Sequence, residues 1–122
     1  MTYETKCVDL KELGNGVKRD NNEGKGAYEL ISPLALKRLA QVYERGAKQK
    51  GGRNWEAGFP MSRCIQSALR HTEQYLEGMR DEDHLAQAAW NLFAAIHFEE
   101  QIARGNLPTE LNDLPNYLTI KS

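Results

Sequence analysis

Three amphipathic stretches, each ended by glycine, constrain the fold of this chain more than any other feature of its sequence. The first begins at Ser32-Pro33, where a hydroxyl can cap a helix and proline fills the first helical position without losing a hydrogen bond. Gly51-Gly52 ends this stretch, and Gly78 and Gly105 end the other two. The predicted helices cover residues 32–50, about 61–77 and 81–105. The chain is therefore predicted to be all-α, with three long helices and irregular ends.

Each predicted helix carries an apolar stripe at three- and four-residue intervals, which is typical of a helix that packs on one face. The stripes consist of Leu36, Leu39, Ala40, Tyr43 and Ala47, then Ile65, Ala68, Leu69, Thr72 and Leu76, and then Leu85, Ala88, Ala89, Leu92, Ile96 and Ile102. Four further residues lie partly off the third stripe: Trp90, Phe93, Ala94 and Phe98. Because three helices in 122 residues provide little core, we expect a homodimer or homotetramer to cover the remaining apolar surface.

Length and charge limit the kind of protein further. We expect one domain (1–122), in which a mostly irregular arm (1–31) precedes the helical core (32–105) and an extended tail (106–122) follows it. A net charge of −1 argues against a nucleic-acid polymer as partner. The sequence has neither the ~20-residue apolar run of a membrane helix nor an export signal, so we expect a cytoplasmic protein with no membrane partner. Cys7 and Cys64 are then expected to be free thiols.

Acidic residues gather around the junction of the second and third predicted helices. Glu73 and Glu77 lie one turn apart on the second helix. Three more follow across a short turn: Asp81, Glu82 and Asp83. If the helices form an antiparallel hairpin, these carboxylates meet at one end, where Mg²⁺ or Mn²⁺ would neutralise them. An ordinary solvated acidic surface is the alternative, and both interpretations stay open.

Histidines flank the same junction, and a polar stripe follows one of them. His84, Gln87 and Asn91 recur at helical spacing, although Asn91 falls within an otherwise apolar helix and must find hydrogen-bond partners there. With His71, this arrangement admits a His…His-Asp metal phosphohydrolase as an alternative. The order here is Asp83-His84, however, and no later Asp on a long helix completes that set.

Two loops offer residues suited to a nucleotide. Lys25 lies between glycines in a segment that lacks the Walker pattern, but Lys25 and Arg19 are suited to contact phosphates as mobile cations. A solvated loop is the alternative. Asn54 and Trp55 can present an amide and a flat ring to a nucleobase, whereas Trp55 and Phe59 can equally plug the end of the helical bundle.

Several short runs form a combined pattern at a specific spacing. They are Ser67–His71, Asp81–Leu85 and Ala89–Leu92, joined by Arg19-Asp20, Gly24–Gly26, Tyr28–Ile31, Gly46-Ala47, Arg53–Trp55, Gly105, Leu107-Pro108 and Glu110-Leu111. Over residues 12–118 the sequence resembles a phage and bacterial family of dATP/dGTP diphosphohydrolases, related to the MazG-like all-α nucleotide pyrophosphohydrolases. The resemblance implies a helical bundle completed by oligomerisation, in bacterial or phage-infected cytosol.

The resemblance also implies an activity: hydrolysis by water of a (deoxy)nucleoside triphosphate, dGTP or dATP, between the α and β phosphates, with Mg²⁺ or Mn²⁺ as cofactor. The candidate metal ligands are Glu73, Glu77, Asp81, Asp83 and His84. The candidate catalytic residues are Glu73, Glu77 and His71, and the candidate substrate-binding residues are Arg19, Lys25, Asn54, Trp55, Arg70 and Asn91. Glu73 and Glu77 depart from the ExxE…ExxD pattern of MazG-like enzymes, which motivates a non-catalytic nucleotide-binding or interaction module as the alternative.

Overall fold

The computed structural model describes residues 7–9, 18–20 and 23–118, and the chain divides into two compact units, Met1–Ser32 and Pro33–Ser122. In the first unit, strands β1 (Cys7–Asp9) and β2 (Lys18–Asp20) pair in antiparallel register, with Val8 opposite Arg19. A 3₁₀ turn, η2 (Tyr28–Leu30), follows them in the chain. The arm that the sequence predicts to be mostly irregular therefore contains a short hairpin.

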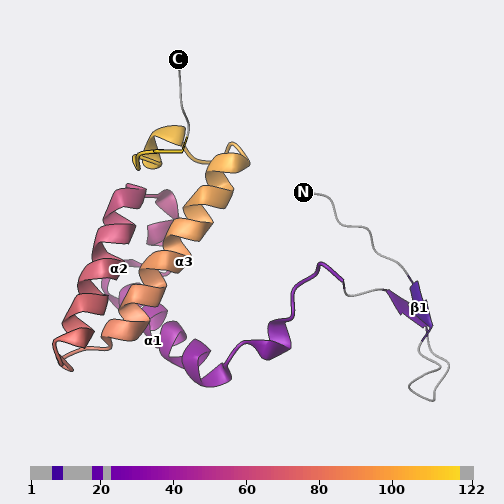
Figure 1. The fold of residues 1–122 in the computed structure, drawn as a ribbon, viewed down its shortest axis with the longest axis horizontal. Helices are drawn as coiled ribbons and strands as arrows, with labels where there is room; N and C mark the ends of the chain where they lie inside the picture. Colours follow the sequence, from indigo (N-terminus) through magenta and orange to yellow (C-terminus); the bar gives the residue numbers. More distant parts are fainter. Residues whose placement is uncertain (1–6, 10–17, 21–22, 119–122) are drawn as a thin grey trace. The chain divides into compact units, whose positions relative to one another are not determined.

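The second unit consists of three α-helices: α1 (Pro33–Lys50), α2 (Met61–Leu76) and α3 (His84–Ala103). Figure 1 shows α2 and α3 side by side, while α1 packs mainly against α3. Short 3₁₀ turns, η3 (Asn54–Ala57) and η4 (Thr109–Leu111), precede α2 and follow α3. The predicted all-α fold with three long helices is confirmed. Of the helices that the structure describes, none is long and apolar enough to cross a membrane.

Local sequence signals set the ends of the helices. α1 begins at Pro33 and stops before Gly51, whose φ of 94° is a left-handed conformation that glycine adopts without strain. The acidic cluster predicts that α3 starts at residue 81, whereas the structure starts it at His84. The reason is that Asp83 serves as the N-cap, because its carboxylate accepts the backbone N–H of Ala86 at 3.1 Å.

The buried core joins the first half of α2 to the second half of α3. It consists of Met61, Cys64, Ala94, Ala95 and Phe98, and the rings of Trp55, Phe59 and Trp90 pack against it. Cys64, Ala94 and Phe98 are completely inaccessible to solvent. The largest aromatic side chains of the chain thus sit where the loop before α2 meets the two helices.

The face that α2 buries overlaps the stripe that the sequence pattern favours only in part, at Ala68. Met61, Cys64 and Ala68 are buried, but Leu69 and Leu76 of the predicted stripe are 63% and 71% exposed. The pattern was a reliable indicator of a helix but not of the face that this chain covers.

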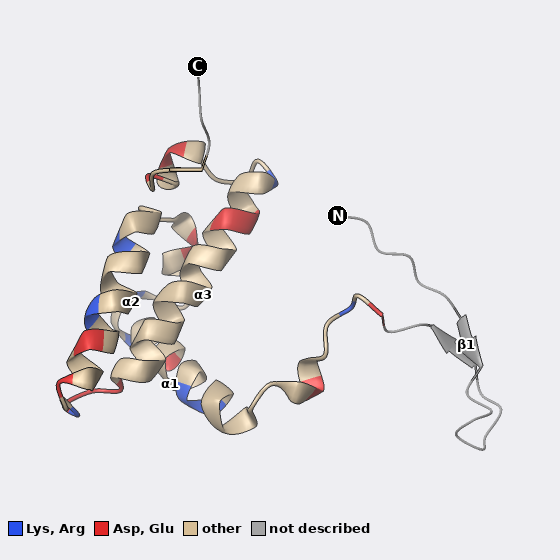
Figure 2. Cartoon of the chain, in the orientation of Figure 1, with Lys and Arg blue, Asp and Glu red and all other residues tan. Residues whose placement is uncertain are grey.

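α3 shows the same difference, because it is apolar around most of its circumference. No charged residue occurs from His84 to Phe98, and most of the α3 ribbon in Figure 2 carries neither charge colour. Ala94 and Phe98, which lie off the predicted stripe, are buried, whereas Leu92 and Ile96 on it are exposed. A three-helix chain can cover only one of the two apolar faces.

The tail returns to cap α2. Pro60 occupies the N-cap position and makes no side-chain cap bond, so the free N–H groups of the first turn need another acceptor. Asp113 supplies it: its carboxylate accepts the Ser62 N–H at 2.9 Å and the Ser62 hydroxyl at 2.6 Å. These bonds lower the pKa of Asp113. The tail, predicted to be extended, therefore contains η4 and a specific contact with α2.

The burial of Cys64 predicts an unreactive thiol. Burial raises its pKa to about 11, so the thiol stays protonated at neutral pH and lacks the nucleophilic thiolate. In a Cys7→Ser background, we expect iodoacetamide to label the folded protein at least about tenfold more slowly than the urea-unfolded protein. Equal labelling rates would contradict the buried position.

The raised pKa of Cys64 also predicts how stability depends on pH. Because the thiol of the unfolded chain loses its proton at the ordinary pKa of 9.0 and that of the folded chain only at about 11, the free energy of unfolding should fall between these two pH values.

The uncovered stripe of α3 predicts self-association. Leu85, Leu92 and Ile96 are 42%, 45% and 58% exposed and share one helix face. We expect light scattering to find a dimer or tetramer at micromolar concentration, and Ile96→Glu to shift it toward the monomer because a charge cannot be buried there cheaply.

Leu118→Glu is the matched control, because this leucine is 94% exposed and lies in the tail. It should leave the assembly intact. A wild-type chain that is monomeric at micromolar concentration, or equal dissociation by both variants, would rule out the α3 stripe as the interface.

Candidate functional site

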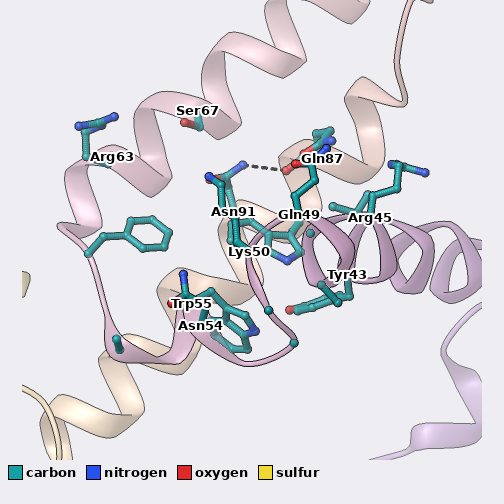
Figure 3. Close-up of a pocket in the computed structure, with 18 of the residues that line it drawn as sticks. Tyr43, Arg45, Gln49, Lys50, Asn54, Trp55, Arg63, Ser67, Gln87 and Asn91 are labelled. Carbon is teal, nitrogen blue, oxygen red and sulfur yellow. Dashed lines mark hydrogen bonds between the residues drawn. The ribbon is translucent and has the colours of Figure 1, made fainter.

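A cavity of about 670 Å³, called here the pocket, opens between the end of α1, the loop 51–60 and the facing sides of α2 and α3. Figure 3 shows its lining residues coming from all four segments. The volume lies within the ~300–1,000 Å³ that is typical of small-molecule sites. The pocket adjoins the aromatic part of the core, so its walls are held by packed residues.

Aromatic rings form one wall of the pocket. The ring centroids of Tyr43, Trp55 and Trp90 lie 5.9 to 6.1 Å apart, and Phe59 stacks on Trp90 with an interplanar angle of 9°. Burial raises the pKa of Tyr43, so its phenol is neutral at physiological pH. Trp55 packs against the core and also lines the pocket, so its predicted packing at the end of the bundle is seen, while its predicted contact with a nucleobase stays a prediction.

Amide side chains and cations make up the polar lining. The amides are Gln49, Asn54, Gln87 and Asn91, and the cations are Arg45, Lys50 and Arg63. The Asn91 amide nitrogen donates to the backbone carbonyl of Gln87 at 2.9 Å, the dashed line in Figure 3. Among the described residues that line the pocket, there is no Asp or Glu. The pocket is therefore suited to a ligand that combines a flat, hydrogen-bonding group with negative charge.

The loop that carries Asn54 and Trp55 is fixed from outside the pocket. Gly58 follows η3 with φ of 95°, and a Cβ atom there would lie 2.7 Å from Cδ1 of Leu111. Leu107 lies against the same glycine. Glycine adopts this backbone conformation without strain, and its lack of a side chain leaves room for Leu111. Residues after α3 thus hold the position of the aromatic wall.

A second group of polar residues, called here the histidine cluster, lies at the turn between α2 and α3. It consists of His71, Asp81, Glu82 and His84, and Figure 2 shows the acidic ribbon at this turn. Nδ1 of His71 and Nδ1 of His84 are 2.9 Å apart, and Nε2 of His84 is 2.8 Å from Oδ1 of Asp81. Oε1 of Glu82 lies 3.9 Å from Nδ1 of His71.

Burial shapes the protonation of the histidine cluster. The His84 side chain is 1% exposed and that of His71 is 12% exposed. Burial lowers the pKa of His71, partly offset by the negative charge of Glu82, so its imidazole is neutral at pH 7. The hydrogen bond from His84 lowers the pKa of Asp81, which stays ionised. Two imidazoles, of which His71 is neutral, and two carboxylates therefore meet at this turn.

Asp83 points away from the histidine cluster toward α1. Arg38 donates to both carboxylate oxygens, with Nε at 2.8 Å and Nη2 at 2.6 Å, and Ala86 N–H donates to Oδ1. The Arg38 guanidinium holds the pKa of Asp83 below its usual range. Asp83 thus joins α1 to α3 and caps α3, and its predicted role as a metal ligand stays a prediction.

The structure brings together two subsets of the residues predicted from sequence. Asn54, Trp55 and Asn91 line the pocket together. His71, Asp81 and His84 meet in the histidine cluster. Sequence reasoning placed Gln87 on the same stripe as His84 and Asn91, and it lines the pocket as well.

The other predicted residues lie elsewhere. Arg70 and Glu73 on α2 and Glu77 at its C-cap are exposed and do not line the pocket. Lys25 is exposed in the first unit, and the side chain of Arg19 lies outside the described residues. Their substrate-binding, catalytic and metal-binding roles stay predictions.

Sequence reasoning missed the three cations of the pocket and the place of Glu82. Arg45 and Lys50 lie in the last turns of α1, and Arg63 in the first turn of α2. Basic residues near helix ends are common, so nothing in their spacing distinguished them. Only the folding of α1 against the loop 51–60 shows that they share one cavity.

Comparison with known families identifies the class. Residues 15–106 match the model of the family described as dATP/dGTP diphosphohydrolase, N-terminal. The match spans more than half of the chain, so the chain belongs to this family. Searches of curated proteins and of solved structures found no match.

The resemblance implies Mg²⁺ or Mn²⁺ on carboxylates of two successive helices, and the described residues do not assemble such a set. Within this part of the chain, the group whose possible ligand atoms lie within 4.8 Å of one another is His71, Glu82 and His84. Glu73 and Glu77 do not belong to it. Because Mg²⁺ prefers oxygen ligands, a group with two imidazoles does not fit it.

The dual role of Asp83 leads to a prediction about stability. Asp83→Ala removes the cap of α3 and should lower the free energy of unfolding by about 0.5–2 kcal/mol. Asp83→Asn keeps a good capping side chain but removes the charge that faces Arg38. We therefore expect a smaller decrease in the free energy of unfolding, measured by urea denaturation. Arg38→Ala is the control for the ion pair, and it should resemble Asp83→Asn. An Asp83→Asn variant as unstable as Asp83→Ala would show that the cap is not the main contribution.

Proposed function

We propose that this chain binds a purine deoxynucleoside triphosphate, dGTP or dATP, and hydrolyses it between the α and β phosphates to the monophosphate and pyrophosphate. Membership in a family named for dATP/dGTP diphosphohydrolases supports the proposal. The observation that carries it is the lining of the pocket, where aromatic rings, amides and cations occur without an acidic residue among the described ones.

The aromatic and amide part of the pocket is suited to a nucleobase. A base that stacks on an aromatic side chain gains about 1–3 kcal/mol. Trp55 and Tyr43 offer rings, and amides such as Asn54 can both donate to and accept from the edge of a purine. This combination is suited to a flat ring that both stacks and hydrogen-bonds at its edge.

The cations are suited to the triphosphate. Arg45, Lys50 and Arg63 are exposed side chains along the same cavity, so they reach an anion without being buried themselves. Arginine binds phosphate oxygens through paired N–H donors, whereas lysine acts as a point charge. A carboxylate in the pocket would repel the negatively charged triphosphate. A lining without Asp or Glu among the described residues is therefore consistent with this substrate.

Water is the proposed nucleophile. Cys64 is buried and stays protonated at neutral pH because its pKa is about 11, so it is not an activated thiolate. In the proposed reaction, the oxygen of water bonds to the α phosphorus while the bond from that phosphorus to the α–β bridging oxygen breaks. Pyrophosphate leaves with the bridging oxygen, and the proton of water passes to solvent or to a neutral base.

A nucleotide-binding module without activity is the second candidate function. The observation that favours it is that Glu73 and Glu77, the carboxylates expected to hold metal, lie outside the group of assembled ligand atoms. Such a module would keep the pocket and its ligand but release no pyrophosphate.

Intrinsic fluorescence tests binding directly, because both tryptophans of the chain line the pocket. We expect dGTP or dATP to quench this fluorescence saturably. Arg63→Ala should weaken binding by about tenfold or more, as expected for a lost charge-assisted hydrogen bond. Arg104→Ala, an exposed arginine outside the pocket, is the matched control and should bind like the wild type.

Release of pyrophosphate from the same nucleotides, measured with Mg²⁺, Mn²⁺, Co²⁺ and Zn²⁺ in turn, tests the reaction. Turnover that falls with Arg63→Ala and not with Arg104→Ala supports the proposal. Quenching without turnover under any of these ions would establish the binding module instead. Neither quenching nor turnover would overturn the assignment of the pocket.

A further inference from the structure

We propose that His71, His84 and Glu82 bind a late first-row divalent metal ion, such as Co²⁺, Ni²⁺ or Zn²⁺, with Asp81 as the residue that orients His84, and that Mg²⁺ does not bind there. The role of this ion in turnover rests on the proposed function, whereas its binding does not.

The distances among the three donor groups suit a single ion. Two ligands at about 2.1 Å from one ion lie ~3.0 Å apart when they are at right angles and ~4.2 Å apart when they are opposite each other. The Nδ1 atoms of His71 and His84 are 2.9 Å apart, and Glu82 Oε1 is 3.9 Å from Nδ1 of His71. All the donor atoms lie within 4.8 Å, so only a small movement of Glu82 is needed. Its side chain is 46% exposed and free to make it.

The hydrogen bond to Asp81 prepares His84 as a ligand. Nε2 of His84 lies 2.8 Å from Oδ1 of Asp81, and because a carboxylate only accepts, this contact selects the tautomer with N–H on Nε2. In that tautomer Nδ1 of His84 accepts the Nδ1–H of His71 at 2.9 Å. An ion bound by both Nδ1 atoms would take the place of this proton, which moves to Nε2 of His71 or to solvent. Metal-bound histidines characteristically donate their second ring nitrogen to a carboxylate, which fixes both tautomer and orientation. The arrangement of Asp81 and His84 has this form before any ion binds.

The donor set selects the kind of ion. Imidazole nitrogens favour Zn²⁺, Ni²⁺ and Fe²⁺, and affinity rises along the first row from Mn²⁺ to Cu²⁺. Mg²⁺ requires near-octahedral oxygen ligands. The two carboxylates of the histidine cluster also carry two negative charges, which a divalent ion neutralises.

The position of the site relates it to the pocket. Ser67 and Gln87 line the pocket, and each lies about one helical turn from a histidine of the cluster, Ser67 from His71 on α2 and Gln87 from His84 on α3. An ion held by the histidines would therefore lie just beyond the edge of the pocket that these two residues form. This is where an anion that extends out of the pocket along α3 would meet it.

Cobalt provides a probe that does not depend on activity. We expect Co²⁺ added to the wild-type chain to give visible d–d absorption bands that saturate at one ion per chain, and Zn²⁺ to displace it. Calorimetry with Mg²⁺ at the same concentration should give the same heat for the wild type and for variants that lack the histidines, because Mg²⁺ does not bind at this site.

Variants separate ligands from neighbours. His71→Ala and Glu82→Gln should weaken Co²⁺ binding at least tenfold, and Asp81→Asn by about 10- to 100-fold, because it no longer orients His84. Glu99→Gln is the matched control, an exposed acid on α3 outside the cluster and outside every predicted site, and it should keep the wild-type Co²⁺ affinity. Circular dichroism of each variant checks the fold, and Glu82→Gln is the decisive variant because its side chain is not buried.

The outcomes distinguish this inference from the proposed function. Pyrophosphate release with Mg²⁺ and no saturable Co²⁺ spectrum would overturn the metal site and leave the function standing, with the histidines as a structural hydrogen-bonded pair. A Co²⁺ spectrum lost in Glu82→Gln, without turnover under any ion, would support the site and contradict the enzyme. If the Co²⁺ affinity falls in Glu77→Gln but not in Glu82→Gln, Glu82 is not the ligand, and the inference is overturned.

Discussion

The rest of the structure depends on how α3 accommodates two buried polar side chains. This helix carries no Asp, Glu, Lys or Arg from His84 to Phe98, yet His84 and Asn91 are among its buried residues, and an unpaired polar group there would cost about 1–3 kcal/mol. Asn91 is satisfied by the carbonyl of Gln87, one turn before it. His84 needs partners from elsewhere, Asp81 of the turn and His71 of α2, so its hydrogen bonds fix how α2 and α3 pair.

The two polar residues also divide the candidate site by chemistry. Asn91 belongs to a pocket whose charged lining is basic, whereas His84 belongs to a cluster whose charged members are acidic. A nucleoside triphosphate bound with a metal ion requires both environments, cations for its oxygens and anions for the ion. The net charge of −1 argues against a nucleic-acid polymer as partner, but it does not show that basic and acidic groups lie at different places along one helix.

Sequence patterns predicted the helices well because their ends depend on neighbours in the chain. Pro33, Gly51 and Asp83 act locally, through a fixed φ, a left-handed turn and a cap. The buried faces were harder, because α3 has two apolar faces and only packing chooses between them. The pocket residues Asn54, Trp55 and Asn91 stood out by type, whereas Arg63 and Glu82 did not, since their importance comes from contacts across the fold.

The contact between the tail and α2 has a consequence for the order in which the chain becomes complete. Asp113 caps α2 across 51 residues, and Leu107 and Leu111 pack against the glycine that ends the aromatic loop. During synthesis, α1, α2 and the loop leave the ribosome well before these partners exist. The helices can form early from local contacts, but the pocket reaches its final shape only after the segment beyond α3 has been made.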